Sequence, residues 1–425
     1  MRIRAVAALA SLAFAAAACG GGETAKPEAA PEATPAGSAS SSAAPAAGGK
    51  LVIWSEGAKR TAALKPFAEQ FGTENGVTVE IKELTDNPQQ AFVTASQQGS
   101  GPDVMVGAHD WIGNMVQNGA IEPVTLTEEQ KAAFNPVAMK AVTFNGQVYG
   151  APYAVENLAI IRNTELVPEA PATFDELVAK GAELKKAGKV KEILCLQVSE
   201  RGDAYHAYPL FSSAGGSLFG TTAAGDPDPA KVTVGTGDSV KAWAKLGEFG
   251  KAGALKATIT PENSIATFAS GKCAFLESGP WAMNDVKKSG LKYDVSAVPG
   301  VEGGKPATPF VGVQAFFVAA KGKNKTLAQE FVTNYVTNVD VAKALYEADP
   351  RPPALSAALE AVQGNDPDLA KFLEAGKDGM PMPAIPEMSA IWEPFGIAEV
   401  SVIKGGDPAK AAAAAQTAVE KTLKK

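Results

Sequence analysis

The 425-residue sequence contains little histidine and cysteine and has no excess of positive charge. His109 and His206 are its only histidines, and none of its three cysteines forms a Cys-x-x-Cys pair or another spacing typical of a metal site. The formal net charge of −7 leaves no surplus of cations to neutralise phosphates, which excludes a nucleic-acid-binding protein. We therefore expect no metal, no cofactor and no nucleic-acid partner.

Long hydrophobic runs are also scarce. The apolar run of residues 5–18 is too short to span a bilayer, and it follows Arg2 and Arg4, as in a secretory signal peptide. It ends in Ala16-Ala17-Ala18-Cys19, which resembles a bacterial lipobox in which Cys19 becomes lipidated. Ordinary cleavage near Ala18 is the alternative. In both cases we expect the mature chain outside the cytoplasm, lipid-anchored to the outer face of the cell membrane or periplasmic.

Residues 20–49 consist almost entirely of Gly, Ala, Pro, Ser, Thr, Glu and Lys. This composition cannot bury a core, so we expect a signal peptide over residues 1–18 and a lipidated cysteine with a disordered tether over 19–49. The two remaining cysteines, Cys195 and Cys273, lie in strand-like apolar runs. In an oxidising compartment they are compatible with one disulfide, and equally with two buried thiols.

From Lys50 onward, strand patterns alternate with helical patterns. Residues 51–54 and 103–106 have the composition of short strands, and a helical pattern between them ends at Asn75-Gly76. A further strand is expected at 193–198, and the chain is mainly helical after residue 325. The alternation predicts an α/β fold with a parallel sheet and crossover helices, and the chain length favours two lobes. Ligands of such sheets bind beyond the carboxyl ends of the strands.

Loops at those predicted strand ends combine aromatic and polar side chains, as carbohydrate binding requires. A pyranose has an apolar face, which Trp281 and Trp392 can cover, and hydroxyl groups that Asp110 and Glu156 can bind. Each residue alone also has a structural interpretation. A tryptophan can belong to the core, Asp110 can cap a helix, and Lys59 can be a solvated surface charge.

Six short motifs, in this order, resemble those of the maltose/maltodextrin-binding proteins of ABC importers. They are Lys50-Leu-Val-Ile-Trp54, Gly101-Pro-Asp-Val104 with Ala108-His-Asp110, Tyr149-Gly-Ala-Pro-Tyr-Ala-Val-Glu156, Ser278-Gly-Pro-Trp281, Pro309-Phe-Val-Gly-Val313, and Met382-Pro-Ala-Ile-Pro-Glu-Met-Ser-Ala390 with Trp392. The resemblance runs from Lys50 to the C-terminus. It implies a two-lobed, periplasmic-binding-protein-like α/β fold with a hinge and a ligand cleft between the lobes.

The resemblance also implies which residues contact the sugar. The implied ligand-binding residues are Asp110, Glu156, Trp281, Trp392, Lys59, Tyr205, Trp111 and Asp203. Gly107 stands where the best-known members have a stacking tryptophan, and Trp111 where they have arginine, which suggests that the aromatic ring has moved four residues along. Glu393 and Gly396 likewise replace a tyrosine and an arginine. The class of ligand is retained, and the exact sugar and chain length stay open.

By the same resemblance, lobe 1 comprises residues 50–155 and 314–353, and lobe 2 comprises 156–313 and 354–425. Hinges are expected near 154–157, 313–315 and 352–354. The implied function is capture of malto-oligosaccharides by hinge closure, and their delivery by a monomer to the permease subunits of an ABC importer. A different oligosaccharide, such as trehalose, is the nearest alternative.

A glycoside hydrolase is the competing class of protein. It would need two carboxylates that flank one glycosidic bond, a role conceivable for Asp110 and Glu156. No nucleophile elbow, metal motif or histidine-based constellation in the sequence supports catalysis, so we expect a binding protein and not an enzyme.

Overall fold

The computed structural model describes residues 49–223 and 225–424. The predicted signal peptide, the lipidation of Cys19 and the tether up to residue 48 lie outside these residues. Within the described ranges, no helix has both the length and the apolar character needed to cross a membrane.

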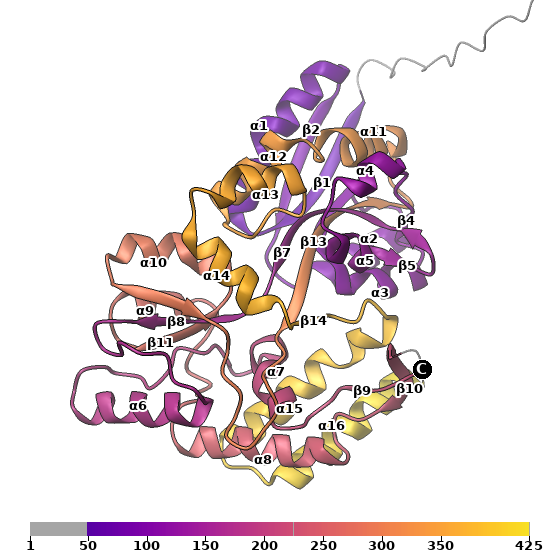
Figure 1. Ribbon diagram of the computed structural model, residues 1–425. Helices are drawn as coiled ribbons and strands as arrows, with labels where there is room; N and C mark the ends of the chain where they lie inside the picture. The colour runs from indigo at the N-terminus through magenta and orange to yellow at the C-terminus, as the bar shows by residue number, and fades with distance from the viewer. Residues whose placement is uncertain (1–48, 224, 425) are drawn as a thin grey trace, which may run out of the picture. The chain divides into compact units, whose positions relative to one another are not determined.

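Two large hydrophobic cores define two lobes of the described chain (Figure 1). The first core is built from residues between Leu51 and Ala154 together with residues between Val313 and Ala358. The second is built from residues between Leu158 and Phe310 together with residues between Met382 and Val419. Tyr346, Val362 and Leu369 form a small separate hydrophobic cluster.

The first lobe is organised around a mixed seven-stranded sheet in the order β14-β13-β3-β1-β2, with β4 and β7 also paired to β13. The strands are β1 (Lys50–Glu56), β2 (Thr78–Leu84), β3 (Val104–Ala108), β4 (Ile121–Glu122), β7 (Gly150–Glu156), β13 (Phe310–Ala319) and β14 (Met380–Pro381), with a small β5 (Thr143–Phe144) and β6 (Gln147–Val148) hairpin beside them. The helices are α1 (Ala58–Asn75), α2 (Pro88–Gln97), α3 (Ile112–Gln117), α4 (Glu128–Ala132), α5 (Pro136–Ala141), α11 (Lys325–Glu330) with its continuation η3 (Phe331–Tyr335), α12 (Val339–Ala348) and α13 (Ser356–Gln363).

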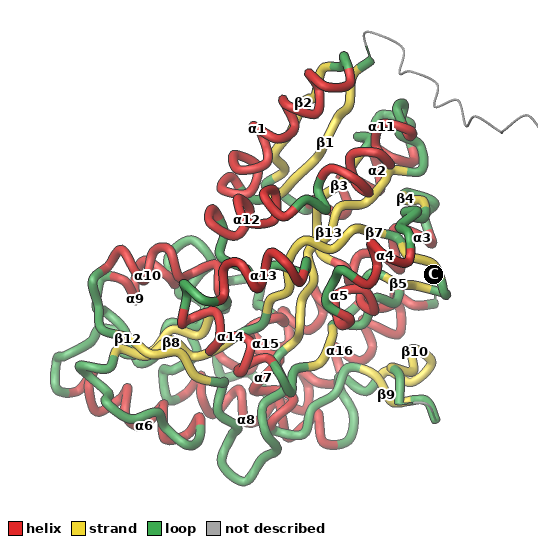
Figure 2. The backbone as a smooth tube through the Cα atoms, turned by 45° about the horizontal axis from the view of Figure 1, so that its top comes forward, coloured by secondary structure: helices red, strands yellow, loops and turns green. Residues whose placement is uncertain are grey.

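The expected parallel sheet is present only in part. β1 pairs in parallel with β2 and β3, and α1 ends at Gly76, whose φ of 65° is the left-handed conformation expected there. β13, in contrast, runs antiparallel to β3, β4 and β7. Figure 2 shows β7 and β13 side by side, running in opposite directions between the two lobes. The sheet therefore places the ends of β1, β3 and β7 near the junction of the lobes.

The second lobe contains a three-stranded antiparallel sheet in the order β11-β8-β12. Its strands are β8 (Ala159–Asn163), β11 (Phe275–Ser278) and β12 (Tyr293–Ser296), with a β9 (Phe219–Thr221) and β10 (Pro227–Val232) hairpin nearby. Its helices are α6 (Phe174–Lys186), α7 (Ala204–Ser213), α8 (Asp238–Lys251), α9 (Ser264–Ala269), η2 (Pro280–Ala282), α10 (Met283–Ser289), α14 (Pro367–Gly376), η4 (Pro386–Ala390), α15 (Trp392–Ile403) and α16 (Pro408–Leu423).

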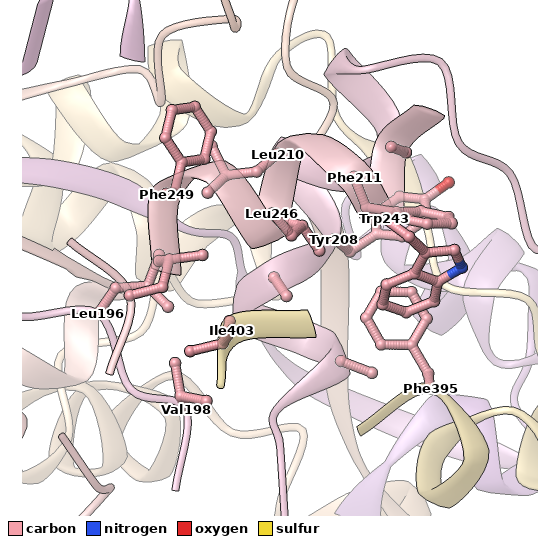
Figure 3. Packing of buried hydrophobic residues seen from close by; sticks show 14 of the residues in the cluster. Leu196, Val198, Tyr208, Leu210, Phe211, Trp243, Leu246, Phe249, Phe395 and Ile403 are labelled. Carbon is pink, nitrogen blue, oxygen red and sulfur yellow. The ribbon is translucent and has the colours of Figure 1, made fainter. Parts of the chain in front are cut away.

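Aromatic packing fixes two helices of the second lobe that matter for the site (Figure 3). Trp243 of α8 is fully buried against Phe211 of α7 and Phe395 of α15, with ring centroids 4.8 and 4.6 Å away. Such contacts stabilise beyond the burial of the area alone. The same packing therefore holds the start of α7, which carries Tyr205, and the start of α15, which is Trp392.

The expected strand at 193–198 is wrong as a continuous strand. The segment makes only isolated pairings with the neighbourhood of β11, between Glu192 and Cys273 and between Cys195 and Leu276. A disulfide joins Cys195 to Cys273, with 6.0 Å between the Cα atoms, which decides between the two states that the sequence left open.

Candidate ligand-binding site

A pocket of about 350 Å³ draws its walls from both lobes. Six of the eight sequence-predicted residues line it, and they are Asp110, Trp111, Glu156, Tyr205, Trp281 and Trp392. Gln89, Ala108 and Met382 complete the lining. The volume lies within the range for small-molecule sites, roughly 300–1,000 Å³.

His109 anchors the turn η1 (His109–Trp111), which carries two of the pocket residues directly after β3. Its Nδ1 accepts a hydrogen bond from the backbone N–H of Val313, and its Nε2 lies 3.0 Å from the carbonyl oxygen of Met382. The first contact leaves Nε2 to carry the proton and donate it to Met382. Because burial lowers the pKa of His109 to about 4, the ring stays neutral. This histidine has a structural role.

Asp110 is a buried carboxyl group in this turn, and it caps no helix. Burial is the largest cause that raises its pKa, to about 7, and the carboxylates of Glu56 and Glu156 act in the same direction. The Trp392 side chain opposes this shift. Asp110 is therefore poised near neutral pH, at the wall of a pocket, with like charges near it.

Trp111 lies across the backbone at Gly107. A Cβ atom on Gly107 would come within 2.1 Å of the indole ring of Trp111, so a side chain at position 107 and the present ring position exclude each other. The same relation holds between Gly279 and Trp281, where a Cβ atom would lie 2.0 Å from the ring. Each glycine thus makes room for a tryptophan of the pocket.

Glu156 ends β7 with its carboxylate buried and fully engaged. Its Oε1 accepts a hydrogen bond of 2.9 Å from Gln314, and its Oε2 accepts one from Nε of Arg351. Burial alone would raise the pKa of this carboxyl, but Arg351 and Gln314 hold it below its usual value. Glu156 is consequently an ionised acceptor at neutral pH.

The second lobe contributes three aromatic side chains to the pocket. Trp281 lies in η2, directly after β11, and its ring centroid is 6.4 Å from that of Tyr205. Trp392 begins α15 and meets Phe310 edge to face at 6.2 Å. All three aromatic side chains are half-buried, so part of each ring stays open toward the pocket.

Lys59 and Asp203, the other two predicted residues, do not line this pocket. Lys59 is exposed on α1, and its Nζ lies 3.2 Å from the carboxylate of Asp285 on α10 in the second lobe. Asp203 caps α7 by accepting from the backbone N–H of His206, and it accepts a second bond from Gln197. Both of its oxygens are therefore occupied within the protein.

Sequence reasoning missed Gln89 and Met382 of the lining, and also Arg351, which contacts two pocket residues. Arg351 contacts Glu156 and Asp349, and its guanidinium carbon lies 4.9 Å from the centre of the Trp281 ring. The signal available in the sequence is its place in Asp349-Pro-Arg-Pro-Pro353, beside an expected hinge. Within residues 49–223 and 225–424, no group of three or more potential metal ligands is present.

The chain belongs to the bacterial extracellular solute-binding proteins, because the model of that family matches residues 65–371, well over half of its length. The chain is thus a solute-binding protein and not an enzyme, as the sequence predicts.

Three curated relatives show similarity over most of their length. A galactooligosaccharide-binding protein of Bacillus subtilis is 28% identical, over 86% of this chain and 87% of the relative. A maltotriose-binding protein of Pyrococcus abyssi is 29% identical, over 81% and 75%. A maltooligosaccharide ABC transporter solute-binding lipoprotein of Streptococcus pneumoniae is 28% identical, over 85% and 86%.

Proposed function

We propose that this protein binds maltose or short malto-oligosaccharides outside the cytoplasm and delivers them to an ABC importer. The observation that carries the proposal is the pocket itself, which combines the rings of Trp111, Tyr205, Trp281 and Trp392 with the carboxyl groups of Asp110 and Glu156. Aromatic faces suit the C–H face of a pyranose, and carboxylates suit its hydroxyl groups. Two of the three relatives reported above are named for maltotriose or maltooligosaccharides.

We also propose that binding closes the protein about hinges near residues 154–157, 313–315 and 352–354. Lobe 1 would then comprise 50–155 with 314–353, and lobe 2 would comprise 156–313 with 354–425, apart from the segment around residues 354–358, which packs in the first core. The pocket supports this proposal because Trp111 of its lining packs against the first core, and Tyr205, Trp281 and Trp392 pack against the second. A ligand that touches both lobes binds the closed form better and shifts the population toward it.

For the N-terminus, we propose lipidation of Cys19 and a tether that holds a monomeric binding protein near its permease. The residues 16–19 and the preceding apolar run support it, as does the word lipoprotein in the name of the pneumococcal relative. Mass spectrometry of the protein from its native membrane tests this step, since an unmodified Cys19 contradicts it.

Isothermal titration calorimetry tests the choice of sugar. We expect one-to-one binding of maltose and maltotriose, and weaker binding of trehalose, because its linkage through both anomeric carbons orients the second ring differently from that of maltose. Galacto-oligosaccharides belong in the same series, since one relative is named for them. Preference for galacto-oligosaccharides or trehalose would replace the proposed ligand, and turnover of any of these sugars would contradict a pure binding role.

A further inference from the structure

Arg351 contacts two of the pocket residues. It lies in the segment after α12, and its side chain is only 13% exposed. Its Nε donates to Glu156 and its Nη1 to Asp349, while its flat guanidinium group lies 4.9 Å from the ring centre of Trp281. Glu156 and Asp349 flank the first core, whereas Trp281 packs against the second. Arg351 therefore bridges the lobes.

The guanidinium group offers the same recognition features as a sugar ring. It presents a flat, weakly hydrated face to an aromatic ring, and N–H donors at its edge to carboxylates. A pyranose presents an apolar face and hydroxyl donors in the same relation. One face of Trp281 and the Oε2 atom of Glu156 are thus occupied by the groups that a sugar would replace.

We propose, on the basis of the proposed function, that Arg351 is a specificity-determining residue that stands in for a sugar ring until a ligand displaces it. An incoming sugar must cover Trp281 and supply a hydroxyl to Glu156. A ligand without that hydroxyl leaves a buried carboxylate short of a donor, and such sites reject analogues strongly. Every ligand that displaces Arg351 loses the same two contacts, and only a ligand that covers Trp281 and donates to Glu156 replaces both of them.

A displaced Arg351 guanidinium group can keep one of its present partners, Asp349. Asp349 precedes Arg351 by two residues and also lies 4.0 Å from Arg60, so a released guanidinium keeps a carboxylate partner in its own segment. Arg60 itself is buried against Glu56 and the Tyr153 ring and does not contact Trp281. Of these two arginines, only Arg351 both covers the ring and pairs with Glu156.

Calorimetry with maltose and maltotriose on the full-length protein tests the proposal, with wild type, Arg351→Met and Arg351→Lys compared. Methionine keeps an aliphatic stem but has no donor and no flat cation. We expect Arg351→Met to bind both sugars more tightly, by roughly 2- to 30-fold, the range that a cation–π contact is worth. The sugar affinity of Arg351→Lys should lie between those of Arg351→Met and wild type. If Arg351→Met does not fold, the comparison of Arg351→Lys with wild type still tests the proposal.

The ligand-free proteins provide a second readout that a merely structural role would not produce. Loss of a contact between the lobes should make ligand-free Arg351→Met less compact in small-angle scattering. Its affinity should still rise, because the free Trp281 face and the free Glu156 oxygen outweigh the added cost of closure. Lys287→Met, which breaks ion pairs with Asp366 and Asp368 away from the pocket, is the matched control and should change neither. If wild type binds these sugars and the Arg351 variants bind them with equal or lower affinity, the inference about Arg351 is wrong and the proposed function stands. No binding by wild type would overturn the proposed function and, with it, the role of Arg351.

Discussion

Asp110 is the pocket residue whose protonation should appear directly in ligand binding. Its pKa is raised to about 7, and a sugar hydroxyl donates to the ionised carboxylate better than to the protonated acid. Binding therefore requires release of a proton below this pKa. We expect the affinity of wild type for maltotriose to fall as the pH falls below 7, by up to about tenfold per unit, and to level off above it.

Calorimetry between pH 5.5 and 8.5 checks this expectation. Asp110→Asn cannot ionise, so its weaker binding should be nearly independent of pH over the same range. A matched change at the exposed Asp285, Asp285→Asn, should leave the pH profile of wild type in place. A flat profile for wild type would show that Asp110 is not a charged acceptor of the sugar.

Glu277 is a second residue with a clear pH signature, in stability and not in binding. It is 1% exposed, and neither carboxylate oxygen has a partner among the described residues. Burial, followed by the charges of Asp203 and Glu399, raises its pKa well above 4.5. The folded protein thus holds this proton more tightly than the unfolded chain. The resulting stability is complete below about pH 4.5 and is lost as the pH rises through the folded pKa.

Glutamine cannot ionise, so the Glu277→Gln variant should not lose stability at this position as the pH rises. Its melting temperature should exceed that of wild type at pH 8 by roughly 2 °C or more, and the two should converge toward pH 5. Thermal unfolding followed by circular dichroism at both values measures the difference. Glu360→Gln, at an exposed position, is the control. An equal or lower melting temperature for Glu277→Gln at pH 8 would mean that Glu277 is ionised and stabilised in the fold.

At the level of single residues, the sequence predicts most of the polar and aromatic side chains that line the pocket, and their roles in sugar binding stay predictions. Asp110, Glu156, Trp281 and Trp392 all line it, because each lies at the end of a strand, in the turn that follows a strand, or at the start of a helix at the junction of the lobes. Arg351 could not be predicted in the same way. Its contacts depend on how a proline-rich segment crosses between lobes, and no periodicity or spacing encodes that path.

Among the elements, those with a regular pattern and clear ends are predicted best. α16 occupies 408–423, within the stretch after residue 325 that the sequence predicts to be mainly helical, and its alanine-rich face and its capping Asp407 are local signals. β13 has no such signal. All ten of its residues are buried, so it lacks the alternation that marks a half-exposed strand. α7 contains Pro209 in its interior, which argues against a helix until the packing of its aromatic residues is known.

The disulfide is the element-level feature with the most direct test. Cys195 and Cys273 enclose a loop with a sequence separation of 78, and removing a native disulfide typically costs about 2–5 kcal/mol. We expect Cys195→Ala with Cys273→Ala to unfold at a lower urea concentration than wild type. Sugar affinity should change by less than about threefold, because β8 still holds β11, and with it the approach to Trp281, in register.

Reduction distinguishes the bond from the packing of the two sulfur atoms. Dithiothreitol should lower the urea midpoint of wild type toward that of the double variant and leave the double variant unchanged. A wild-type midpoint that does not respond to reduction would show that the two cysteines are not bridged in the purified protein.

Across the whole molecule, polar contacts join the two lobes around the pocket. Lys59 pairs with Asp285, and the side-chain amide of Asn284 donates to the backbone carbonyls of Glu347 and Ala348 at 3.3 and 3.2 Å. An exposed ion pair of this kind contributes about 0–1 kcal/mol. Opening of the lobes therefore costs little free energy at these positions. A ligand that bridges the pocket can then shift the equilibrium between the open and closed forms.

Small-angle scattering measures that balance. Saturating maltotriose should reduce the radius of gyration of wild type, because a sugar held by Asp110 on one lobe and Trp281 on the other binds only the closed form with both contacts. Trp392→Ala should show little change at the same sugar concentration, since it loses one wall of the site. A disaccharide that calorimetry shows not to bind serves as the control. If maltotriose binds tightly but leaves the radius of gyration of wild type and of Arg351→Met unchanged, the two lobes form a rigid site, and delivery to a permease cannot depend on closure.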